Sequence, residues 1–214
     1  MQADEPLFLG VDIGTYGTKG CLVSYSGRII ATAYIETPLP TISGEYAEEW
    51  PDLWLNACLQ TIKDILKLSK INPSDIGGIS ISGFAPACVF VDKQFVPVRP
   101  AIIWIDRRAV KETKSIKEKI GEKEIFEKTG NVIDPYFGFT KILWVKNNEP
   151  NIWGKVHKIL TIQGYVVHKL TGINCIDHSS AGNIGGIYNI HKRSWDEGLM
   201  DELQIPRDFF PRED

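Results

Sequence analysis

Short apolar runs separated by turn signals occupy the first part of the chain and predict strands. The runs cover Leu7 to Val11, Cys21 to Tyr25 and Ile29 to Ile35. A glycine-rich turn separates the first two runs, and Ser26-Gly27 is a tight-turn signal before the third. Such spacing is typical of an antiparallel meander of three strands.

The period of the apolar positions changes after Pro51, where they recur every three or four residues. This spacing places them on one face of a helix that we expect to run to about Ser69. Pro51 suits the first helical turn because its missing N–H would have no partner there. The expected apolar face consists of Trp54, Cys58, Ile62, Ile65 and Leu66.

Strands and helices alternate along the rest of the chain. We expect strands at Gly78–Ser82, Ala87–Val91 and Val156–Leu160, with a further apolar run at Arg99–Ile105. We expect helices from Asp106, around Lys141–Asn147, at Tyr165–Leu170 and at Trp195–Leu203. The stretch from Lys111 to Lys128 alternates lysine with glutamate, which predicts a solvated helix face. Together these elements predict a mixed α/β sheet layered with helices.

The composition excludes several classes of protein. Of the 214 residues, 43% are hydrophobic and 24% charged, which is ordinary for a soluble globular protein. The net charge of −3 gives no basic field to attract nucleic acid or an anionic membrane. The acidic start, Met1 to Pro6, lacks the layout of a signal peptide, and no apolar run approaches the roughly 18 residues of a membrane span. Four widely spaced cysteines suit a reducing compartment, so we expect a cytoplasmic protein with free, apolar thiols: Cys21, Cys58, Cys88 and Cys175.

The turn at residues 12–19 carries the candidate chemistry. Gly14 and Gly17 allow positive φ, so their backbone N–H groups could form a nest around an anion. Hydroxyl groups and the ammonium of Lys19 add further donors for phosphate oxygens. The candidate nucleotide-binding residues are therefore Gly14, Thr15, Tyr16, Gly17, Thr18 and Lys19.

Asp12 is the unusual member of this turn, because a carboxylate beside phosphates is repulsive unless a cation lies between them. Mg²⁺ would supply that cation, held mostly through water. The turn is not a P-loop or a Rossmann turn, since both require a helix directly after the glycines and a strand is expected here. Taken by itself, the segment is equally compatible with an ordinary hairpin.

The order of several motifs resembles one protein family. The turn resembles the first phosphate motif of the actin, hexokinase and Hsp70 superfamily. Further segments resemble the FGGY carbohydrate kinases, a family that includes glycerol kinase and xylulokinase. These segments are Trp50-Pro51-Asp52 with Trp54, the run Arg99–Arg108, the loop Thr129–Phe137, the helix Lys141–Val145, and Leu170-Thr171-Gly172 followed by Asp177–Ala181. The resemblance extends from about Leu7 to Pro211.

The resemblance implies a ribonuclease H-like α/β fold, with a mixed sheet whose first three strands are antiparallel. It implies a kinase that uses ATP and Mg²⁺, with Asp12 at the metal, to phosphorylate a hydroxyl of a small sugar or polyol. Residues 1–214 would form the N-terminal, sugar-binding lobe. The general base and the adenosine-binding lobe are expected beyond Asp214, so no catalytic base is assigned within this chain. The resemblance also allows a homodimer.

The substrate-binding candidates also come from the resemblance. Trp104 and Tyr136 match positions that line the sugar site, where an aromatic face packs on C–H groups and the tyrosine hydroxyl bonds to oxygen atoms. Asp106 is either a sugar contact or the cap of the helix expected there. The segment Phe84-Ala85-Pro86 stands where glycerol kinases have Arg-Glu and xylulokinases have Gln-Met-His. This departure puts both glycerol and xylulose in doubt and leaves the substrate open.

Two other functions remain open at this point. One is a relative that binds nucleotide or sugar without transferring phosphate. The other is an actin- or Hsp70-like ATPase, which the sugar-site aromatic residues disfavour.

Overall fold

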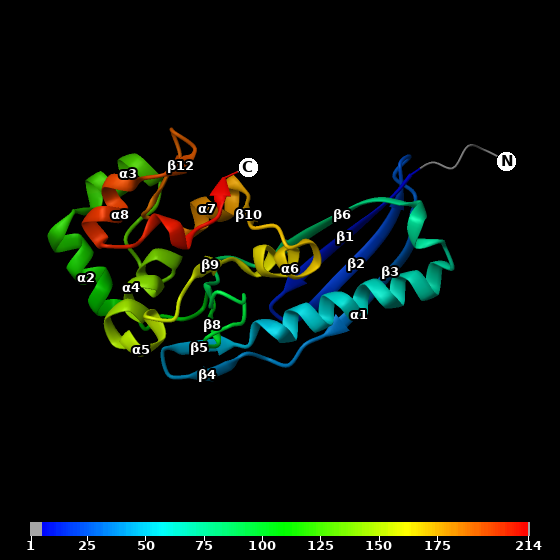
Figure 1. The fold of residues 1–214 in the computed structure, drawn as a ribbon, viewed down its shortest axis with the longest axis horizontal. Helices are drawn as coiled ribbons and strands as arrows, with labels where there is room; N and C mark the ends of the chain where they lie inside the picture. The colour runs from blue at the N-terminus through cyan, green and yellow to red at the C-terminus, as the bar shows by residue number, and fades with distance from the viewer. Residues whose placement is uncertain (1–5, 214) are drawn as a thin grey trace. The chain divides into compact units, whose positions relative to one another are not determined.

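The computed structural model describes residues 6–213, which form two compact units. Unit 1 contains residues 6–39 and 52–84, and unit 2 contains residues 40–51 and 85–213. The acidic start of the chain, for which we expect no signal peptide, lies outside the described residues except for Pro6. Figure 1 shows the elements of both units.

Unit 1 is built on a four-stranded sheet with the order β3-β2-β1-β6. Its strands are β1 (Leu7–Gly14), β2 (Gly17–Ser24), β3 (Ile29–Glu36) and β6 (Ile76–Gly83). β2 is antiparallel to both β1 and β3, whereas β6 is parallel to β1. The predicted meander is therefore confirmed, and the fourth strand makes the sheet mixed.

Helix α1 (Pro51–Ser69) covers one face of this sheet (Figure 1). Alternate residues of β1 are buried, as the period of a half-covered strand requires: Leu9, Val11 and Ile13. The helix approaches β2 closely, since a Cβ on Gly20 would lie 2.5 Å from side-chain atoms of Ile65 and Thr61. A 3₁₀ turn at Pro73–Asp75, capped by the side chain of Asn72, then leads into β6.

Unit 2 contains several short strands and seven α-helices within the described residues. One sheet has the order β4-β5-β8, and three strand pairs complete the set. The strands are β4 (Thr41–Ser43), β5 (Tyr46–Glu49), β8 (Ala101–Ile102), β7 (Val89–Val91) with β9 (Lys158–Leu160), β10 (Cys175–Ile176) with β13 (Arg212–Glu213), and β11 (Tyr188–Asn189) with β12 (Ser194–Trp195). The helices are α2 (Val110–Lys119), α3 (Glu122–Thr129), α4 (Gly138–Asn148), α5 (Pro150–Trp153), α6 (Ile162–Thr171), α7 (His178–Ile184) and α8 (Glu197–Leu203), with a 3₁₀ turn at Arg207–Phe209.

The core of unit 2 surrounds α4. Phe139, Ile142 and Val145 of this helix are completely buried. They belong to one apolar cluster that also takes side chains from the strands and from α2, α3, α7 and α8. Burial of these apolar side chains is the main stabilising contribution to such a unit.

Several expected helix boundaries were wrong, including the start of α6, which lies at Ile162 and not at Tyr165. The helix expected from Asp106 begins at Val110, because the Asp106 carboxylate is occupied by Arg108 and cannot cap the helix. The helix expected from Trp195 begins at Glu197, after Asp196 accepts the N–H of Leu199 at 3.1 Å. The charged stretch that we read as one helix face forms two helices, since Gly121 with φ of 95° separates α2 from α3.

Candidate functional site

Asp12 and Lys19 face each other on the uncovered side of the unit 1 sheet. They are register partners on β1 and β2, so their side chains leave the same face of the sheet. Both are exposed, whereas their neighbours Ile13 and Thr18 are buried on the side of α1. Ser82 of β6 stands opposite Asp12 on its other flank. The fold thus places a carboxylate, an ammonium and a hydroxyl side by side.

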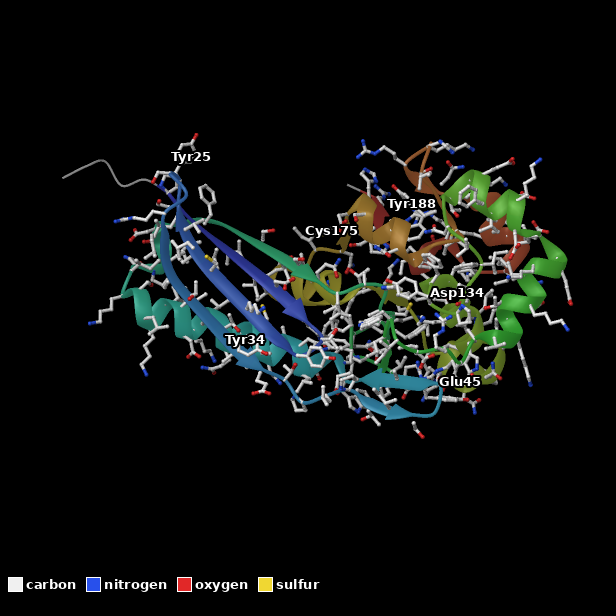
Figure 2. All side chains as sticks on the ribbon, turned by 180° about the vertical axis from the view of Figure 1, so that it is seen from behind. Tyr25, Tyr34, Glu45, Asp134, Cys175 and Tyr188 are labelled. Carbon is white, nitrogen blue, oxygen red and sulfur yellow. The ribbon has the colours of Figure 1, made fainter. Side chains whose placement is uncertain are left out.

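A cavity of about 650 Å³ lies on this face of the sheet. Lys19 borders it, with its Nζ 6.0 Å from the ring centroid of Tyr34. Tyr34, labelled in Figure 2, lies on β3. The Tyr34 hydroxyl donates a hydrogen bond of 2.9 Å to the carbonyl oxygen of Tyr16. The lining residues are Gly10, Val11, Asp12, Lys19, Gly20, Cys21, Thr32, Ala33, Tyr34, Ser80 and Ser82.

The glycines of the turn play a different part from the one expected. Neither Gly14 nor Gly17 has positive φ, so the expectation of a nest based on positive φ was wrong. Gly17 is instead needed for close packing, because a Cβ there would lie 2.5 Å from the Tyr34 ring and 2.6 Å from the Ile35 carbonyl oxygen. A strand follows this turn, as predicted.

The candidate phosphate-binding residues do not all gather in one place. Thr18 is completely buried on the helix-covered face, away from Asp12 and Lys19. Thr15 and Tyr16 form the tip of the hairpin, between the paired glycines. Within unit 1, the structure therefore brings Asp12 and Lys19 together and leaves Thr18 behind the sheet.

Tyr136 is held in unit 2 by contacts to its backbone. Its N–H donates to Asp134 Oδ1 at 2.7 Å, and its carbonyl oxygen accepts from Lys141 Nζ at 2.5 Å. Asp134, labelled in Figure 2, is itself paired with Arg107 through two contacts of 2.7 and 3.1 Å. The Tyr136 ring also meets Phe137 edge to face, with centroids 5.2 Å apart.

Lys141 is completely buried in α4 and also donates to the carbonyl oxygen of Pro135. Burial, the largest contribution, lowers the pKa of Lys141 to about 8. Both of its acceptors are backbone carbonyls of the loop that carries Tyr136. Lys141 therefore fixes the path of this loop.

Tyr136 and the segment after β6 meet directly. The Tyr136 hydroxyl lies 3.1 Å from the carbonyl oxygen of Ala85, to which it donates a hydrogen bond. Pro86, the next residue, is buried. In unit 1, Phe84 packs edge to face on Trp54 with centroids 5.5 Å apart, and its N–H donates to the Ile13 carbonyl oxygen at 3.0 Å. Two of the predicted substrate-binding positions, Ala85 and Tyr136, thus lie in contact within unit 2.

Asp106 is completely buried and its carboxylate is already engaged. It accepts the N–H of Ala47 at 2.6 Å and two N–H groups of Arg108 at 2.9 and 2.7 Å. The alternative role, capping a helix, was wrong, because α2 begins four residues later. Trp104, two residues earlier, is partly exposed.

Several residues around these sites were not predicted from the sequence. Ser82 and Tyr34 border the cavity but belong to strands whose register the sequence alone does not specify. Arg107 and Asp134 form an ion pair across 27 residues, and their opposite charges within two family-like segments were the only available signal. Lys141 was noticed only as part of a motif, not as an anchor for Tyr136.

Among the residues that the structure describes, no helix is long and apolar enough to cross a membrane. The same residues contain no group of three or more His, Cys, Asp or Glu side chains that could hold a metal ion.

An antiparallel meander, a parallel fourth strand and a covering helix define an α/β protein of the ribonuclease H-like class, with an acidic and a basic residue on the open sheet face. A family model described as the N-terminal domain of the FGGY family of carbohydrate kinases matches residues 7–212. The chain belongs to this family.

Similar proteins carry kinase names. The chain is 34% identical to a xylulose kinase of Lactococcus lactis over 208 residues, covering 95% of this chain and 40% of that protein. It is 33% identical to a glycerol kinase of Rippkaea orientalis, covering 95% of this chain and 42% of that protein. A crystal structure of gluconate kinase from Lactobacillus acidophilus superposes with a TM-score of 0.90 at 28% identity, over 98% of this chain and 42% of the other. The chain thus spans about 40% of the length of these relatives.

Proposed function

We propose that the protein to which this chain belongs transfers the γ-phosphoryl group of ATP to a hydroxyl of a small sugar or polyol. The observation that supports this most is the pairing of Asp12 and Lys19 beside a cavity of about 650 Å³, in a chain of the FGGY family. Phosphoryl transfer depends mainly on positioning and on neutralising phosphate charge. Asp12 and Lys19 offer the groups for that task.

The residues present fit a magnesium–nucleotide complex. Asp12 has an exposed carboxylate, and Mg²⁺ commonly takes one or two protein carboxylates together with phosphate oxygens and water. Magnesium would neutralise phosphate charge when bound. Lys19 would meet a β- or γ-phosphate oxygen as a point charge, and the backbone of the hairpin tip would approach the same phosphates. Thr18 could take part only if its strand turned over, because its hydroxyl lies behind the sheet.

Which part of the full-length protein supplies each functional group is also a proposal. Residues 1–214 would supply the phosphate turn and the sugar-binding side chains Trp104, Tyr136 and the Phe84-Ala85-Pro86 wall. The base that accepts the proton of the attacking hydroxyl, and the adenosine pocket, would come from the remainder of a protein of the relatives' length. The 214-residue chain by itself would therefore not turn over substrate.

We propose that this protein accepts a narrower range of substrates than the family as a whole. The relatives are named for xylulose, glycerol and gluconate. Within the Phe84-Ala85-Pro86 wall there is no charged side chain to clamp a polyol. We propose a sugar or polyol that is bound mainly by aromatic faces and by single hydrogen bonds.

The test uses the full-length protein and a coupled assay of ADP release with xylulose, glycerol, gluconate and other polyols. At least one of these should be phosphorylated. Asp12→Asn should abolish turnover but leave the sugar affinity, measured by calorimetry without nucleotide, within about twofold. The control is Asp64, a partly exposed acid on α1, on the helix-covered side of unit 1, and Asp64→Asn should keep full activity.

A relative that binds nucleotide or sugar without phosphoryl transfer is the second candidate. It predicts binding of a sugar or of ATP to the full-length protein with no release of ADP. That result would overturn the kinase proposal. Loss of sugar binding in Asp12→Asn would instead contradict the role given to Asp12.

A further inference from the structure

A second cavity, with a volume of about 210 Å³, lies in unit 2. It is bordered by α2, α4 and the C-terminal end of α8, three helices of this unit that are labelled in Figure 1. None of the residues assigned above to phosphate or to sugar lines it. The volume corresponds to about seven water molecules of liquid, so the cavity suits a small molecule.

Two lysines from different helices meet at this cavity. Lys119 of α2 donates a hydrogen bond to the carbonyl oxygen of Glu202, and Lys146 of α4 donates to the carbonyl oxygen of Leu203 at 3.0 Å and to Gln204 Oε1 at 3.1 Å. Burial and, after it, the charge of Lys119 lower the pKa of Lys146. An ammonium group has three N–H donors, so these contacts leave each lysine with capacity for a ligand. Two cations that repel each other favour an anion between them.

A buried acid lines the same cavity. Glu112 of α2 is only 6% exposed, and its Oε1 accepts from the side-chain amides of Asn147 at 3.3 Å and Asn148 at 3.2 Å. Its Oε2 is also buried and has no hydrogen-bond partner among the residues that the structure describes. A buried acceptor without a donor costs about 1–3 kcal/mol or more. A ligand hydroxyl group would supply the donor.

The spacing of these groups indicates the length of the ligand. Glu112 and Lys119 lie about two turns, or roughly 10 Å, apart along α2. A single phosphate ion is too small to meet both. A molecule with an anion at one end and a hydroxyl group at the other can do so.

We propose that this cavity binds the phosphate monoester of a small polyol, with its phosphate at Lys119 and Lys146 and a hydroxyl group at Glu112 Oε2. A phosphate carries up to two negative charges and three acceptor oxygens, so it can accept from both ammonium groups at once. A neutral polyol would leave the two lysine charges without a counter-charge.

This site goes beyond the proposed kinase function and does not depend on it. A kinase that phosphorylates a polyol forms an ester of this class, so its product could occupy the sugar site as well as this cavity. The experiment must therefore separate the two sites by substitution.

The experiment measures dissociation constants of the full-length protein by calorimetry, without nucleotide. The probes are glycerol 3-phosphate, inorganic phosphate and glycerol. Lys119→Met should weaken the binding of the ester about 10-fold or more, because a charge-assisted hydrogen bond is lost. Ser115→Glu should do the same, since it adds a carboxylate to the lining of the cavity. Both positions are exposed, so the fold should be retained.

Lys111→Met is the matched control, because Lys111 is exposed on α2 but does not line the cavity. It should bind the ester as the unmodified protein does. A second binding event, at the sugar site, should be unchanged by all three substitutions. Turnover in the ADP-release assay should also be unchanged.

Glu112→Gln tests the hydroxyl contact. Loss of the negative charge should favour the ester and inorganic phosphate alike, so the ratio of their affinities isolates the contact to the hydroxyl group. The preference for glycerol 3-phosphate over inorganic phosphate should fall about 5-fold in this variant.

Several results would overturn the proposal. They are ester affinity that is equal in the unmodified protein, Lys119→Met and Ser115→Glu, equal affinity for the ester and inorganic phosphate, an unchanged ratio in Glu112→Gln, and no binding of the ester. Ester binding that follows the predicted pattern in a protein that releases no ADP with any polyol would overturn the kinase proposal alone.

Discussion

Lys141 and Tyr136 are joined by a hydrogen bond of 2.5 Å from a wholly buried ammonium group to a backbone carbonyl oxygen. A charged lysine is rarely buried without a carboxylate partner. Here the partners are two carbonyl oxygens, those of Pro135 and Tyr136. The lysine thus links the core of unit 2 to the residue that we place in the sugar site.

The stability of the chain should depend on pH through Lys141. Its pKa is about 8 in the folded chain and 10.5 ordinarily, so between these values the unfolded chain binds more protons. The unfolding free energy should therefore rise with pH over this range, by roughly 1–3 kcal/mol for this group. Urea unfolding of the 214-residue chain from pH 7 to pH 10 checks this.

The contribution of Lys141 is isolated by subtraction, because other groups also titrate at high pH. Lys141→Met should remove the rise, whereas Lys155→Met, at an exposed position, should keep it. An identical pH dependence in all three proteins would show that burial does not depress the pKa of Lys141.

Asp106→Asn should destabilise the chain by about 3 kcal/mol, because it breaks a buried pair and leaves the Arg108 cation short of a partner. The side chain of Arg108 is 1% exposed, and its second acidic contact, Glu48 at 2.6 Å, can compensate only in part. Chemical unfolding measures the loss, and Asp201→Asn at an exposed position is the control. A variant of unchanged stability that binds sugar poorly would instead assign Asp106 to the substrate.

Gly17→Ala should destabilise the chain by about 1–3 kcal/mol, because its methyl group would overlap the Tyr34 ring and the Ile35 carbonyl oxygen. Gly10→Ala is a matched control on the same sheet, since nothing lies within 4 Å of a Cβ there. The control should change the unfolding free energy by less than about 0.5 kcal/mol. Equal effects of the two substitutions would refute the packing role of Gly17.

Lys19→Met in the full-length protein should weaken ATP binding about 10-fold or more, because a charge-assisted hydrogen bond to phosphate would be lost. Sugar affinity and the melting temperature should stay the same, since Lys19 is exposed. Lys63→Met, on the outer side of α1, removes the same charge from unit 1 and should leave ATP affinity unchanged. Calorimetric titration with ATP distinguishes the two variants, and unaltered affinity in Lys19→Met would remove Lys19 from the phosphate site.

Local features of the fold were predictable because each depends on neighbours in the sequence. The meander and α1 follow from apolar periods of two and of about 3.6. The ends of the helices in unit 2 were harder to predict, because they depend on which polar side chain is free to cap the helix. Asp106 could have capped a helix, and it is instead engaged by Arg108 and by Ala47, 59 residues away.

The features of the candidate site also fall into those that the sequence predicts and those that depend on the tertiary structure. The sequence by itself determined the family, the strand–turn–strand motif and the residue types Asp12 and Lys19, because strand alternation and motif order are local properties. Only the tertiary structure decided that Thr18 faces the helix and that Gly17 allows close packing. It also decided that the Tyr136 hydroxyl meets the carbonyl oxygen of Ala85, 51 residues away in the sequence. Such contacts arise when distant segments close on a common core, and the direction of a hydrogen bond is known only once both partners are in place.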